Sequence, residues 1–209
     1  MTAPGMARRL QEIRQRGGKV ILIDPRYNET ARFADRHLFI RPGTDVLLLL
    51  SLLHVVFDER LEHFDQLAPF TKGVETVAKL VADFPPERVA TITGIAANEI
   101  RLLAREFASA GSAVCYGRIG LSTQEFGGDC QWLINVLNIV TGNLDRPGGA
   151  ARPRRPVAAA RRATGDRQAA GDLRTREGGL RTALRAQQPP RLGGDPRGGN
   201  RPTAARGRR

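Results

Sequence analysis

The chain has 209 residues and a formal net charge of +12, with 33 lysines and arginines against 21 aspartates and glutamates. This length provides for one domain with its own hydrophobic core, or for slightly more. Aromatic residues make up only 5% of the chain and there are two cysteines, which excludes a disulfide scaffold and a cysteine-rich metal domain.

The positive charge is confined to the C-terminal part of the chain. Residues 1–150 hold 17 basic and 17 acidic residues, whereas residues 151–209 hold 16 arginines, 4 acidic residues and no lysine. Arginine, alanine, glycine and proline dominate this tail, which has too few apolar residues to offset the entropy of ordering, so we expect it to be disordered. Because these four residues have GC-rich codons, our hypothesis is that residues 151–209 are an off-frame translation without a function of their own.

A helix and two strands are expected in the first 41 residues. Residues 6–16 carry one apolar stripe flanked by charges, which predicts an amphipathic helix. Gly17-Gly18 should end it, since glycine adopts the left-handed C-cap conformation readily. Lys19–Asp24 is a continuous aliphatic run that suits a parallel strand covered on both faces, and His37–Arg41 is a second short strand.

Helices are expected to dominate the rest of the charge-neutral part. The turn Pro42–Asp45 opens an apolar helix over 45–59, with Thr44 or Asp45 as its cap. One further strand is expected at Ala113–Gly117, followed by a glycine-rich turn. The remaining predicted helices span 74–83, 86–93, 97–109 (capped by Asn98) and 128–141.

This alternation of helices and strands predicts an α/β fold, namely a partial Rossmann-like layered domain with a mainly parallel sheet. In such sheets, ligands bind outside the carboxyl ends of the strands. Three loops follow predicted strands: residues 24–28, 42–45 and 117–128. We expect them to meet at one edge and to bind a nucleotide there.

Several other site types are not indicated. The apolar run Val46–Phe57 is shorter than the ~20 residues that span a bilayer, and the N-terminus lacks a secretory signal, so a cytoplasmic protein without a membrane segment is predicted. Cys115 and Cys130 form no CxxC motif, and we interpret both as small buried hydrophobes. The three histidines lack metal-ligand spacing, and His54 is interpreted as a hydrogen-bonded core residue. We therefore assign no catalytic or metal-binding residue.

Four stretches of the first 150 residues resemble one known family in order and spacing. The chain is similar to the molybdopterin-guanine-dinucleotide oxidoreductases, which include formate dehydrogenases, periplasmic nitrate reductases and dimethyl sulfoxide reductase, and it most resembles the formate-dehydrogenase-like branch. The stretches are PGMARRLQEIRQRGGKVILIDPRYNETARFAD, HLFIRPGTDVLLLLSLLH, YGRIGLSTQEFG and LINVLNIVTGNLDRPGGA.

The resemblance implies an interior fragment of a large catalytic subunit that holds part of a molybdopterin guanine dinucleotide, the cofactor that carries molybdenum. One ionised carboxylate can accept both N–H groups of a guanine edge, and Asp45 is our candidate, with Asp24 as second choice. Arg26 suits the diphosphate, and Gly43 lets the backbone approach the nucleotide. The other implied cofactor contacts are Thr44, in the same turn as Asp45, and Gly120 and Gln124, beside the pterin.

Each of these residues also has a purely structural interpretation. Asp45 can cap a helix, Asp24 can close a strand-ending turn, and Gly120 and Gly127 can serve turn geometry. The chain has neither the cysteine cluster of an iron–sulfur centre nor a match for the family's molybdenum ligand, so we expect it to be inactive alone. The alternative is an α/β module whose arginine-rich tail binds nucleic acid non-specifically. The oligomeric state is not indicated by the sequence.

Overall fold

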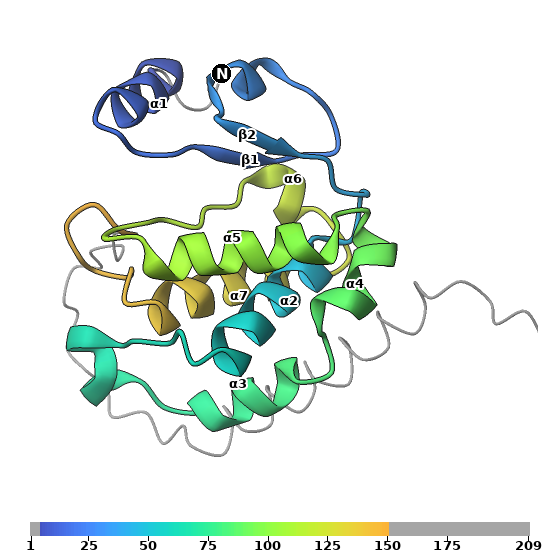
Figure 1. Ribbon diagram of the computed structural model, residues 1–209, viewed down its shortest axis with the longest axis vertical. Coiled ribbons are helices and arrows are strands. Elements are labelled where there is room, and N and C mark those ends of the chain that lie inside the picture. The colour runs from blue at the N-terminus through green and yellow to red at the C-terminus, as the bar shows by residue number, and fades with distance from the viewer. Residues whose placement is uncertain (1–4, 151–209) are drawn as a thin grey trace, which may run out of the picture.

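The computed structural model describes residues 5–150, and it is rich in helix with one small parallel sheet of two strands. In Figure 1 the sheet and helix α1 (Met6–Gln15) lie together at the top of the view, above a group of packed helices that holds the apolar core. The predicted α/β class is confirmed. A Rossmann-like domain would need more strands than the two that the described residues contain, so this finer prediction stays a prediction.

Strands β1 (Ile21–Ile23) and β2 (Arg36–Leu38) run parallel, with Ile21 opposite Arg36 and Ile23 opposite Leu38. Strand β1 begins later and ends earlier than predicted, whereas β2 begins one residue earlier and ends three residues earlier than predicted. They are joined by the short 3-10 helix η1 (Glu29–Phe33), which the sequence analysis did not anticipate. Because the strands are parallel, their carboxyl ends meet at the same edge of the sheet.

Helix α1 ends at the predicted point. Gly17 has φ +81°, a left-handed conformation that glycine adopts without strain. The apolar stripe of Met6, Leu10 and Ile13 is only half-buried, and α1 packs mainly against η1. The predicted amphipathic helix is therefore present, although it contributes no fully buried residue to the core.

Helix α2 (Asp45–Asp58) is the centre of the molecule, as its nearly continuous apolar sequence requires. Ten of its residues are buried, and it packs against α3 (Val74–Val81), α4 (Pro86–Thr93), α5 (Ala97–Ser109) and α7 (Gly127–Val140). A helix that is apolar on all sides is stable only when it is surrounded. Its one histidine, His54, bonds through Nδ1 to the carbonyl of Val81 at 3.0 Å, which confirms the core interpretation.

Two predictions about the later elements are wrong. Helix α5 starts at Ala97 with Ala96 as its N-cap, so Asn98 is already inside the helix and caps nothing. Ala113–Gly117 forms no strand, and it has no strand partner among the described residues. Side chains of the following segment take the place of a neighbouring strand, because Asn138 bonds both the N–H and the carbonyl of Cys115 at 2.9 Å.

The region expected to be a plain glycine-rich turn contains a short helix, α6 (Ile119–Ser122), which packs on α7. Gly127, the first residue of α7, is required by space rather than by turn geometry. A Cβ atom there would lie 2.1 Å from the carbonyl oxygen of Ser122. A further 3-10 helix, η2 (Asp65–Phe70), precedes α3 and was also not predicted.

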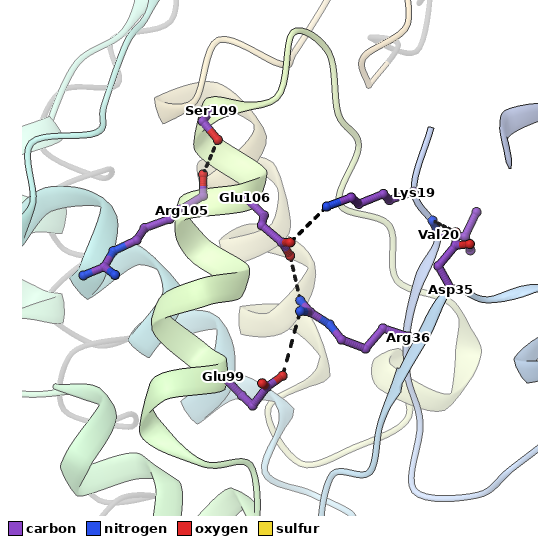
Figure 2. A network of polar contacts seen from close by, with 8 residues as sticks. All are labelled: Lys19, Val20, Asp35, Arg36, Glu99, Arg105, Glu106 and Ser109. Carbon is purple, nitrogen blue, oxygen red and sulfur yellow. Dashed lines mark hydrogen bonds and ion pairs between the residues drawn. The ribbon is translucent and has the colours of Figure 1, made fainter. Parts of the chain in front are cut away.

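Ion pairs connect strand β2 and Lys19, which lies just before β1, to helix α5 (Figure 2). Glu106 of α5 accepts from Arg36 of β2 at 2.8 Å and from Lys19 at 3.2 Å, and Glu99 lies 3.9 Å from Arg36. Ile21 and Ile23 of β1 also pack on the core cluster. The sheet is thus attached by a small apolar contact and a cluster of charges.

Among the described residues, no helix has the length and apolarity needed to cross a membrane. The hypothesis that residues 151–209 are an off-frame tail falls outside the described residues and stays a prediction.

Candidate functional site

The first candidate loop follows β1, and its conformation is set by Asp24. The carboxylate accepts the backbone N–H of Arg26 and the side-chain amide of Asn28, each at 2.8 Å. Asn28 in turn caps η1 by accepting from the backbone of Thr30 and Ala31. Within the protein, the carboxylate of Asp24 therefore stabilises the turn that ends β1, as its structural interpretation predicted. Each oxygen keeps a second lone pair for another donor.

Aromatic side chains flank this loop at the carboxyl edge of the sheet. The ring of His37 lies 5.5 Å from that of Tyr27 and 4.2 Å from that of Phe39. Its Nε2 donates to the carbonyl of Asp24 at 3.0 Å. Tyr27 is 60% exposed and Phe39 is 58% exposed, which is unusual for residues so close to a sheet. The sequence analysis missed both, although their positions beside the strand ends were a usable signal.

Arg26 is exposed, and its guanidinium has no hydrogen bond or ion pair to any of the residues that the structure describes. Only its backbone N–H is engaged, in the turn of Asp24. A free guanidinium at the end of a parallel strand is available to a phosphate or carboxylate.

The second candidate loop leads into α2. Gly43 has φ +81°, and a Cβ atom there would meet nothing within 4 Å. Thr44 is the N-cap residue of α2, but its hydroxyl donates to the carbonyl of Arg41 at 2.7 Å instead of accepting from the helix. Asp45 is the first residue of the helix, and no side chain caps it. The capping interpretation of Asp45 is therefore wrong.

Asp45 has a half-buried carboxylate without a hydrogen-bond or ion-pair partner in the described part of the chain. Its position in the first turn of α2 suits a negative charge, because the helix dipole is positive there. It also lies near the start of α7, since its charge, after burial, helps to raise the pKa of the Cys130 thiol to about 12. Helix α2, which begins at Asp45, packs against α7, which follows loop 117–128.

The third candidate loop contains Gly120 and Gln124. Gly120 is exposed in α6, it lacks a positive φ, and a Cβ atom there would meet nothing within 4 Å. Neither turn geometry nor protein packing therefore requires glycine at this position. Gln124 is half-buried, and its Nε2 donates to the carbonyl of Gly120 at 3.0 Å, which leaves Oε1 as an acceptor.

Cysteine and histidine residues form no site in the described part of the chain. Burial raises the pKa of Cys115 to about 12, and both cysteines are free thiols. No group of three or more histidine, cysteine, aspartate or glutamate side chains within residues 5–150 could hold a metal ion.

The described residues therefore form an α/β segment. Polar loops follow its parallel strands, and an unpaired carboxylate lies at the start of a helix. The family described as "Molybdopterin oxidoreductase" matches residues 2–188, and the chain belongs to this family.

Relatives with known activities place the match more closely. The chain is 36% identical over 150 residues to formate dehydrogenase H of Escherichia coli, covering 72% of this chain and 21% of that protein. It is 32% identical over 152 residues to the F420-dependent formate dehydrogenase 1 subunit alpha of Methanococcus maripaludis, covering 73% and 22%. Acetylene hydratase from Pelobacter acetylenicus superposes with a TM-score of 0.60 at 30% identity, covering 63% of this chain and 18% of that one.

The chain therefore spans about a fifth of the length of the relatives that it matches. None of the comparisons supports the alternative of nucleic-acid binding, which depends on the tail outside the described residues.

Proposed function

We propose that this chain is an interior part of a molybdopterin oxidoreductase catalytic subunit of the formate-dehydrogenase-like branch, and that it binds the guanine dinucleotide end of the cofactor. The half-buried, unpaired carboxylate of Asp45 carries the proposal. A location in the cytoplasm and a Rossmann-like parent sheet, to which β1 and β2 belong, are parts of the same proposal.

Asp45 is preferred over Asp24 for the guanine because of what each carboxylate already does. Asp24 is committed to Arg26 and Asn28 of its own loop, whereas Asp45 has no partner among the described residues. A guanine offers two adjacent N–H donors, and a single carboxylate can accept both. Gly43 leaves open space directly before this group.

The remaining groups suit the rest of a dinucleotide. Arg26 offers a free guanidinium to the diphosphate, and the exposed rings of Tyr27 and Phe39 border the same edge of the sheet. Gly120 and the free Oε1 of Gln124 are the candidate pterin contacts, because no contact within the described residues requires glycine at 120. Thr44 is a weaker candidate, since its hydroxyl proton is used by Arg41.

The bound cofactor would supply the redox chemistry, and this part of the protein would bind and orient it. The names of the relatives include dehydrogenases and a hydratase, so the segment they share with this chain serves more than one reaction. We therefore assign it cofactor binding and no catalytic residue, and we expect the chain to be inactive by itself.

The test is calorimetric titration of the full chain with GDP, IDP and ADP. IDP lacks the guanine 2-amino group and ADP lacks both donors, so we expect the order GDP, IDP, ADP, with about tenfold weaker binding for each lost hydrogen bond to a charged group. Asp45→Asn should weaken GDP binding about tenfold and remove the preference over IDP, because the amide would present a donor where an acceptor is needed.

Asp58→Asn, at the exposed end of the same helix, is the matched control and should bind GDP as the parent chain does. Equal affinity for GDP and ADP, or an unchanged preference in Asp45→Asn, would remove Asp45 from the proposed guanine site.

A further inference from the structure

The described residues form two layers with little packing between them. The sheet layer, residues 5–40, contains α1, β1, η1 and β2, and the helical layer, residues 41–150, contains the helices from α2 to α7 (Figure 1). Extensive packing between elements stays within each layer, where β1 packs on β2, α1 on η1, and α2 on the neighbouring helices. The relative position of the layers therefore depends on a few apolar side chains and on the polar contacts between them.

The proposed dinucleotide site uses both layers. Arg26 follows β1, and its loop is fixed by Asp24, whose carboxylate accepts the backbone N–H of Arg26. Asp45 begins α2, and the loop before it is attached to α4 by Arg41, whose backbone N–H donates to the carbonyl of Thr93 at 2.8 Å. One proposed contact thus belongs to the sheet layer and the other to the helical layer. A ligand that uses both contacts binds tightly only when the layers keep one relative position.

Glu106 of α5 holds the sheet at the amino ends of its strands. Its Oε1 accepts from Lys19, two residues before β1, at 3.2 Å, and its Oε2 accepts from Arg36, the first residue of β2, at 2.8 Å (Figure 2). A strand of three residues is about 10 Å long, and Arg26 lies beyond the opposite end of β1. A tilt of the sheet at Glu106 would therefore move Arg26.

Burial and charge distinguish this contact from an ordinary surface ion pair. The side chains of Glu106 and Arg36 are 26% and 27% exposed, and the Nε atom of Arg36 is buried without a hydrogen-bond partner among the described residues. The sheet layer holds 8 basic and 4 acidic residues, whereas the helical layer holds 9 basic and 13 acidic residues. The two layers thus carry opposite net charges, and Glu106 lies where they meet.

We propose that Glu106 is a positioning residue for the dinucleotide site. Through Arg36 and Lys19 it sets the orientation of the sheet layer relative to the helices. That orientation brings Arg26 to the diphosphate of a ligand whose base is bound at Asp45. Glu106 acts through the two cations and does not itself contact the ligand. This inference rests on the proposed function, because it takes Arg26 and Asp45 as contacts of one ligand.

The experiment compares guanosine with GDP by calorimetric titration of the full chain. Guanosine reaches only the base contact of the helical layer, whereas GDP also uses Arg26, so we expect the parent chain to bind GDP about tenfold more tightly. Glu106→Gln should bind guanosine as the parent chain does and should lose about threefold of the preference for GDP. A general loss of folding would weaken the binding of both ligands, so the preference separates positioning from stability.

Glu87→Gln is the matched control. It breaks an ion pair with Arg101 at 2.8 Å between α4 and α5, within the helical layer, and it should keep the preference for GDP. Both substitutions make the chain more positive by one unit, so a long-range charge effect would strengthen GDP binding in both variants. Lys19→Gln, whose lysine is 71% exposed, leaves the pair of Arg36 in place and should give a smaller loss than Glu106→Gln.

The orientation of the layers is measured without any ligand, from residual dipolar couplings of the backbone amides. In Glu106→Gln the couplings of β1 and β2 should no longer fit the parent orientation relative to α5, whereas those of α2 and α7 should still fit it. Unchanged strand couplings overturn the proposal, and so does an unchanged preference for GDP when the couplings have changed. If the parent chain binds guanosine and GDP equally, the diphosphate contact of the proposed function fails, and the couplings alone decide whether Glu106 orients the sheet.

Discussion

Two buried hydroxyl groups show how much a single hydrogen-bond partner matters. The Oγ atom of Ser51, in the middle of α2, is buried and has no partner among the described residues. Thr93, which is equally buried at the end of α4, donates to the carbonyl of Val89 and accepts from the N–H of Ile95. Burial of a polar atom without a hydrogen-bond partner destabilises the fold by the free energy of desolvation. A hydrogen bond within the protein offsets that loss.

Ser51→Ala is therefore expected to raise the free energy of unfolding by about 1 kcal/mol, from removal of the unpaired hydroxyl and from better helix propensity. Thr93→Val, which keeps the side-chain shape, should lower it by about 1 kcal/mol because the N–H of Ile95 loses its acceptor. Urea denaturation of the full chain measures both. A destabilised Ser51→Ala chain would show that the hydroxyl has a partner in solution.

Helices α2 and α5 are joined at their surface by a charged pair that titrates. Glu59, the C-cap residue of α2, accepts from Arg105 at 2.7 and 2.9 Å, and Arg101 lies 3.7 Å away. A carboxylate is unfavourable at the negative end of a helix, and the two arginines compensate for it. The hydrogen bonds from Arg105 are the main reason why the pKa of Glu59 lies below its ordinary value of 4.5.

A lowered pKa in the folded state means that the stabilisation from Glu59 is complete above pH 4.5 and is lost as the pH falls through the folded value below it. We expect Arg105→Gln to bring the pKa of Glu59 closer to its ordinary value. The free energy of unfolding should then fall less steeply as the pH is lowered below 4.5. NMR titration of Glu59 and urea denaturation from pH 6 down to about 3 measure the two effects. Arg88→Gln should leave the titration of Glu59 unchanged, because among the described residues the Arg88 side chain bonds only to the backbone carbonyl of Asp83.

At this scale, the sequence predicted what depends on local pattern. Apolar periodicity placed α2 and α5 within a residue or two, and Gly17 marked the end of α1, because burial and glycine geometry act over a few residues. Ala113–Gly117 has the composition of a strand, but a ladder also needs a neighbour, which no local pattern can supply. The candidate site divides in the same way: the loops were predictable, whereas the unpaired state of Asp45 depends on which donors the fold brings near.

On the scale of the whole molecule, the small sheet is joined to the helices largely through charges. Glu106 pairs with Arg36 and Lys19, and both Glu106 and Arg36 are about a quarter exposed (Figure 2). The Nε atom of Arg36 is buried without a hydrogen-bond partner among the described residues, so this arginine depends on its carboxylates. These pairs link residues 70 and 87 positions apart, and charge counts along the sequence could not predict them.

Glu106→Gln is expected to lower the free energy of unfolding by about 1 kcal/mol in dilute buffer, because two cations lose a partly desolvated partner. The loss should shrink in about 1 M salt, where exposed charges are screened over a few ångströms. Glu12→Gln, which breaks the exposed pair with Arg8 within α1, should cost less than about 0.5 kcal/mol. Urea denaturation at both salt concentrations measures these differences. Equal effects of the two substitutions would mean that the charges between the layers contribute no more than surface pairs.

Gly120, inside α6, and Gly127, the first residue of α7, are constrained in opposite ways. At 127 the neighbouring backbone leaves no room for even a methyl group, whereas at 120 a side chain would enter open space. Variation among related sequences therefore carries different information at the two positions. Glycine retained at 127 would report only on how α6 meets α7. Glycine retained at 120 would have no cause among the described residues, and it would be evidence that a group outside them occupies that space.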